Sequence, residues 1–103
     1  MTSDLSVSRA VIEEVVRLAA VEVPGVLRVG RAGPAWRAWL GGSPVAARLR
    51  DGRVTVSLHV IARPGQALRP LTADVRVGVA AALERLLGLE VGSVVVVVDG
   101  VGG

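Results

Sequence analysis

The chain has 103 residues, of which 51% are hydrophobic and 20% charged, a composition that predicts one folded domain and excludes a disordered tail. It contains no cysteine, which excludes disulfides, thiolate metal sites and cysteine nucleophiles. The basic residues are all arginines and the net charge is only +3, so charge alone gives modest support for a nucleic-acid partner.

The first predicted element is an amphipathic helix over residues 8–21, because apolar residues recur there every three or four positions. Ser6 or Ser8 can cap its start by accepting a hydrogen bond from a free backbone N–H, and Pro24-Gly25 prevents its continuation. The residues before the helix carry no apolar run, unlike a secretory signal. The longest apolar run in the chain is far shorter than a membrane span, so we expect a cytoplasmic domain.

Three strands are predicted in the middle of the chain. A short extended piece covers residues 26–29, and residues 35–40, beyond a glycine-containing loop, are compatible with one helical turn. Residues 45–50 and 53–62 predict an antiparallel pair, because the intervening Asp51-Gly52 suits a tight hairpin turn. Alternation in the second strand places Val54, Val56, Leu58 and Val60 on one face, and Thr55, Ser57, His59 and Ile61 on the other.

A second helix and a last strand complete the domain. Apolar spacing predicts a helix over residues 71–87 that ends at Gly88, and residues 91–99 predict a valine-rich strand. A strand, a crossover helix and a further strand favour a parallel final pair. The predicted fold class is α/β, as a two-layer α+β domain of order α-β-β-β-α-β, with a mixed sheet and both helices on one face. We expect a single domain over residues 8–99, between flexible termini at 1–7 and 100–103.

Short segments between residues 7 and 99 follow the order of motifs in one known family. The first half contains Val11-Ile12 to Ala19-Ala20 and then Glu22-Val23-Pro24-Gly25-Val26. The second half contains Val54–Ile61, Pro64-Gly65, Leu68, Leu71–Leu87, Gly88-Leu89-Glu90-Val91 and Val94–Val98. Together they resemble the alkaline shock protein family, also called Asp-twenty-three/Gls-twenty-four. The chain departs from that family at Pro64, where a tyrosine is usual, and in the Ala- and Arg-rich surface of its helices.

This resemblance implies a non-enzymatic protein of cell-envelope stress, without catalytic residues and without a cofactor. It also implies a place at the inner face of the cell membrane, through a small integral membrane anchor protein or related family members. The residues agree with a non-catalytic role, because the single histidine has neither a cysteine nor a compelling serine partner in the sequence.

The strand pattern itself predicts a contact surface. If both helices cover one face of the sheet, Val95, Val97 and Ile61 lie exposed on the other face, among polar residues that include His59. We expect His59 to be a surface or interface residue rather than a buried ligand. The hypothesis is self-association through this face, which gives a homo-oligomer. The alternative is that a helix or loop of the same chain covers the face.

Trp36 and Trp39 are the only aromatic residues. Two interpretations remain open for them: an amphipathic patch that docks on a partner or on lipid headgroups, or packing against the core. Their segment is also the natural candidate to cover the second face of the sheet.

A different function is suggested by Gly30-Arg31-Ala32-Gly33, a GxxG loop of the kind with which KH domains approach nucleic acid. In a KH domain this loop joins two helices, whereas here it follows an extended segment. A small KH-like nucleic-acid-binding protein is therefore the alternative hypothesis. Its candidate contacts are Arg28, Gly30, Arg31, Gly33 and Arg37.

Overall fold

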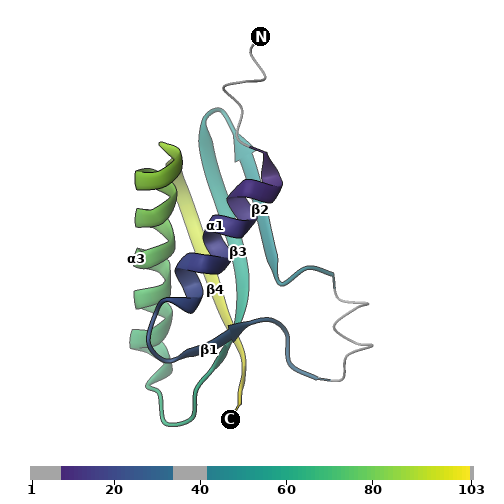
Figure 1. Cartoon of the computed structure of the whole chain (residues 1–103), viewed down its shortest axis with the longest axis vertical. Helices are drawn as coiled ribbons and strands as arrows, with labels where there is room; N and C mark the ends of the chain where they lie inside the picture. Colours follow the sequence, from purple (N-terminus) through teal and green to yellow (C-terminus); the bar gives the residue numbers. More distant parts are fainter. Residues whose placement is uncertain (1–7, 34–41, 103) are drawn as a thin grey trace.

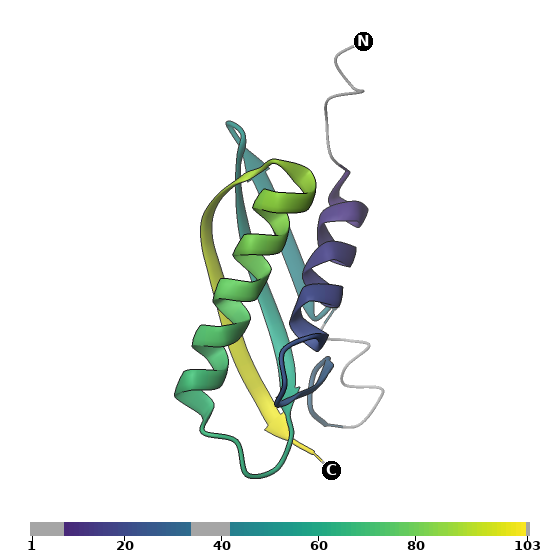
Figure 2. The same ribbon diagram turned by 60° about the vertical axis from the view of Figure 1, so that its left-hand side comes forward.

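The computed structural model describes residues 8–33 and 42–102. Its elements are α1 (Arg9–Val21), β1 (Val26–Val29), β2 (Val45–Arg50), β3 (Arg53–Ala62), α3 (Leu68–Leu87) and β4 (Glu90–Val101). The predicted order α-β-β-β-α-β is confirmed. Figures 1 and 2 show the two helices side by side on one face of the sheet, which makes a two-layer α+β fold.

The sheet is built around β3, the central strand (Figure 1). Strand β4 runs parallel to it along one edge, as predicted for a strand that follows a crossover helix. Strand β2 pairs antiparallel with the first part of β3 and β1 pairs antiparallel with its last part. Since β4 accompanies β3 over its whole length, β1 and β2 must share the opposite edge.

Local sequence explains where the elements begin and end. The Ser8 side chain caps α1 by accepting a hydrogen bond from Val11 N at 3.2 Å. The β2–β3 hairpin turns through Asp51 and Gly52, which both have positive φ, at 55° and 75°, as a tight primed turn requires. Gly88 ends α3 in the left-handed region with φ 66°.

Two predicted boundaries differ from the structure by more than one residue. Helix α3 begins at Leu68 rather than at Leu71, because Pro70 falls in the first turn, where a backbone N–H has no partner within the helix. Strand β4 continues two residues beyond Asp99, to Val101, because Gly100 and Val101 still pair with the end of β3. The expected helical turn at residues 35–40 lies outside the described residues.

The core lies between the helices and the covered face of the sheet. The side chains of Val54, Val56, Leu58 and Val60 on β3 are fully buried, as their alternation predicted. They meet apolar side chains from both helices, which are Ile12, Val16, Ala19 and Ala20 on α1, and Leu71, Val75, Val79, Ala82 and Leu83 on α3. No helix in the described part of the chain is long and apolar enough to cross a membrane.

Candidate interaction surface

The second face of the sheet, called the open face below, is the one that neither helix covers (Figure 2). Cross-strand pairing identifies the side chains on it, because directly opposed residues point to the same side. These side chains are Ala46, Arg48 and Arg50 on β2, Arg53, Thr55, Ser57, His59 and Ile61 on β3, and Ser93, Val95 and Val97 on β4.

Two valines form the apolar centre of the open face. The side chains of Val95 and Val97 are 52% and 37% exposed, beside Ser57 and His59 in the β3–β4 register. Their neighbours along the strand, Val94, Val96 and Val98, turn toward the helices and pack against the core. The prediction that alternation in the last strand splits the valines between two faces is confirmed.

Ile61 does not belong to the exposed surface, which corrects the expectation that it extends the apolar patch. It lies on the open face but is only 3% exposed. A Cβ added to Gly100 would lie 3.1 Å from Ala32 Cβ and 3.5 Å from Ile61 Cδ1, and one added to Gly102 would lie 3.0 Å from Leu27 Cδ2. The chain after β1 and the end of β4 therefore close over Ile61, and the two glycines leave room for this contact.

His59 takes part in the same closure. Its carbonyl accepts a hydrogen bond from Gly30 N at 2.9 Å, and its Nδ1 lies 3.6 Å from Asp99 Oδ2. The Asp99 carboxylate also accepts a hydrogen bond from Ala32 N at 3.1 Å. With its side chain 20% exposed, His59 is a half-buried residue that helps to tie residues 30–32 to the sheet. Sequence patterns gave no sign of this contact, because Asp99 is distant in the chain and sits on a bulge.

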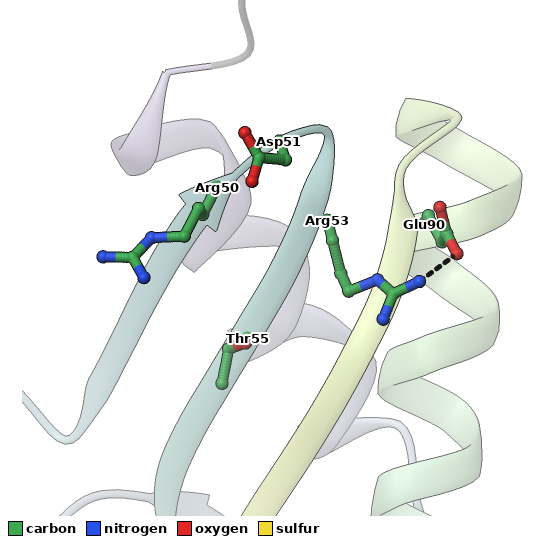
Figure 3. Close-up of a pocket in the computed structure, with 5 residues that line it drawn as sticks. All are labelled: Arg50, Asp51, Arg53, Thr55 and Glu90. Atoms are coloured by element: carbon green, nitrogen blue, oxygen red, sulfur yellow. Dashed lines mark hydrogen bonds and ion pairs between the residues drawn. The ribbon is translucent and has the colours of Figure 1, made fainter.

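Arginines border the end of the open face at the β2–β3 hairpin. A shallow pocket there is lined by Arg50, Asp51, Arg53, Thr55 and Glu90 (Figure 3). Arg53 Nη2 contacts Glu90 Oε2 at 2.8 Å, whereas the Arg50 side chain extends away from this pair (Figure 3). Both partners of the ion pair are more than half exposed, so it contributes little to stability. The hairpin end of the face therefore has a rim of mixed charge, in which Arg50 and the neighbouring Arg48 are the basic side chains beside the paired Arg53 and Glu90.

The GxxG loop does not present its first glycine to solvent. Gly30 is buried, and its N–H is already used by the His59 carbonyl. A Cβ added there would lie 2.5 Å from Arg28 Nη1, so the Arg28 side chain lies across this residue. The backbone approach that the KH-like hypothesis needs is therefore unavailable at Gly30. Gly33, the second glycine of the loop, is by contrast exposed, with a positive φ of 102°.

The remaining site predictions fall elsewhere. Trp36, Arg37 and Trp39 lie outside the described residues. Within residues 8–33 and 42–102, no group of three or more His, Cys, Asp or Glu side chains is placed to hold a metal ion.

The fold and the open face together define a small two-layer α+β domain whose candidate site is a surface rather than a deep pocket. A family model matches residues 1–102, and its description is the Asp-twenty-three family, with a cell envelope-related function. The chain belongs to this family. The resemblance found in the sequence is thereby confirmed, together with the relation of the family to the cell envelope.

Comparison with solved structures supports the same fold. The chain is similar to several forms of the MamM CTD. One substituted form aligns with a TM-score of 0.59 at 16% identity, covering 90% of this chain and 98% of that one. A second substituted form, described as a nickel form, aligns with a TM-score of 0.57 at 16% identity, covering 88% of this chain and 96% of that one. At this identity the likeness concerns the fold alone. No curated protein sequence matches the chain.

Proposed function

We propose that this protein is a non-enzymatic scaffold of the cell-envelope stress response, which acts by binding proteins, beginning with copies of itself. The observation that carries the proposal is the exposure of Val95 and Val97 on a sheet face that neither helix covers. Exposed apolar side chains surrounded by polar residues are typical of a surface that meets another protein. Membership of an envelope-related family supports the cellular setting.

The proposal also places the protein in the cytoplasm, at the inner face of the cell membrane, held there by a small integral membrane partner. Arg48 and Arg50 support this position, because they form a rim of exposed cationic side chains at one end of the open face. Such a rim favours approach to an acidic partner segment or to anionic headgroups. Charges of this kind raise the rate of association more than they raise the affinity.

Sedimentation velocity at low and high salt, with and without a single-stranded oligonucleotide, tests this proposal. Association through buried valines should persist or strengthen as salt rises, since salt does not screen apolar contacts. Binding to phosphates must instead weaken steeply with salt. We expect a salt-resistant oligomer that leaves the oligonucleotide free. A monomer that binds the oligonucleotide at low salt would replace the scaffold with the nucleic-acid-binding alternative.

A further inference from the structure

The free edges of the sheet differ in how well they are protected against pairing with another strand. Natural proteins protect edge strands with charges, prolines, bulges or short length. Strand β1 has four residues and a bulge at its pairing with β3, and β2 carries Arg48 and Arg50. Strand β4 pairs with β3 alone among the described strands, and between Ser93 and Val98 it has no charge, no proline and no bulge.

The valines of β4 are incompletely covered on both sides of the sheet. Val95 and Val97 are exposed on the open face, and Val96, although it faces the helices, is only half-buried. The corresponding β3 residue, Leu58, is 0% exposed in the same layer. A partner stacked on the open face would cover only the valines of that face, and would leave the row that faces the helices, which includes Val96, as it is. A strand added along the edge would contact both rows.

The exposed segment is complementary to itself. If two copies pair antiparallel about Val96, each valine from Val94 to Val98 opposes a valine of the other copy. Exposed residues then oppose exposed ones and half-buried residues oppose half-buried ones, because the burial pattern alternates symmetrically about Val96. A two-fold contact requires this kind of self-complementary patch.

We propose that β4 of one copy pairs antiparallel with β4 of a second copy, centred on Val96, so that the two sheets become one continuous sheet. This inference rests on the self-association proposed above and identifies the contact that produces it. In the paired form Val95 lies beside the partner's Val97, and the two open faces join into one wider valine-bearing surface. That surface remains accessible to a further protein.

Cysteine cross-linking tests the geometry directly, because the chain has no cysteine of its own. Directly opposed residues of an antiparallel pair have Cα atoms roughly 4.5–5.5 Å apart, within disulfide range, whereas diagonal pairs are roughly 7–8 Å apart. Under mild oxidation we expect most molecules of the Val96→Cys variant to form a disulfide-linked dimer. Val95→Cys and Val97→Cys should cross-link efficiently when mixed and about tenfold less when each is oxidised alone.

Val77→Cys on α3 is the matched control, since Val77 is 69% exposed and lies outside the paired strand β4. Backbone amide exchange over residues 93–98, which slows on dimerisation in this proposal, provides a readout without any substitution. Self-cross-linking of Val95→Cys and Val97→Cys with none at Val96 would overturn edge pairing in favour of face-to-face association, and would leave the scaffold function standing. A wild-type chain that is monomeric at all concentrations would overturn both.

Discussion

The Asp99 carboxylate lies 3.6 Å from His59 Nδ1, and the same Oδ2 accepts a hydrogen bond from Ala32 N. One side chain at the end of β4 is therefore joined to the central strand and to the segment that follows β1. This contact closes the open face over Ile61, and Val95 and Val97 remain the large exposed apolar side chains of that face. The valine surface is thus bounded by residues 30–32 at one end of the sheet and by arginines at the other.

Removal of the Asp99 carboxylate should loosen this closure. In Asp99→Ala the Ala32 amide loses its acceptor, which we expect to lower the free energy of unfolding by about 1 kcal/mol. Hydrogen exchange measured by mass spectrometry should accelerate in residues 30–33 and leave α3 unchanged. Asp74→Ala, at an exposed position on α3, is the control. Unchanged exchange in residues 30–33 would show that the carboxylate does not hold the segment.

The hydrophobic core is centred on strand β3. Leu58 on β3 is fully buried between the sheet and the helices, so Leu58→Ala should lower the free energy of unfolding by about 2–5 kcal/mol. Val77→Ala, at a position 69% exposed, should change it by less than about 0.5 kcal/mol. Urea unfolding followed by circular dichroism measures both. Similar losses for the two variants would contradict the assigned core.

Two glycines of the α3 region should respond in opposite directions to alanine. Gly78 lies inside the helix, and an added Cβ would meet Val23 Cγ2 at an ordinary 3.7 Å, so Gly78→Ala should stabilise the protein by about 0.5–1 kcal/mol. Gly88 has φ 66° at the helix end, so Gly88→Ala should destabilise it by about 1 kcal/mol. Thermal unfolding of the pair checks both signs. A destabilising Gly78→Ala would show that the space beside Val23 is closed.

Local patterns in the sequence were sufficient to predict most of the fold. The alternation of β3, the Asp51-Gly52 turn and the end of α3 at Gly88 each follow from the conformations that a few neighbouring residues can adopt. The parallel β3–β4 pair followed from the crossover rule. The start of α3 was missed because a proline normally suggests a break, although it is tolerated in the first turn of a helix.

The candidate surface was predicted less completely. Alternation assigned Val95, Val97 and Ile61 to one face, and all three lie there. It could not show that Ile61 is covered, because the covering residues 30–32 and 100–102 reach it only through tertiary contacts. The contact of His59 with Asp99 depends on the register of two strands and on a bulge, neither of which short-range periodicity specifies.

Light scattering coupled to size exclusion, at low and high salt, tests the central claim most directly. It compares the wild-type chain, the double variant Val95→Glu/Val97→Glu and the control Val77→Glu, with circular dichroism to confirm that each is folded. We predict a salt-resistant oligomer for the wild type and for Val77→Glu, and a folded monomer for the double variant, because like charges would lie side by side across the contact. An oligomer of unchanged size in the folded double variant, or a wild-type monomer at both salt concentrations, would contradict the account.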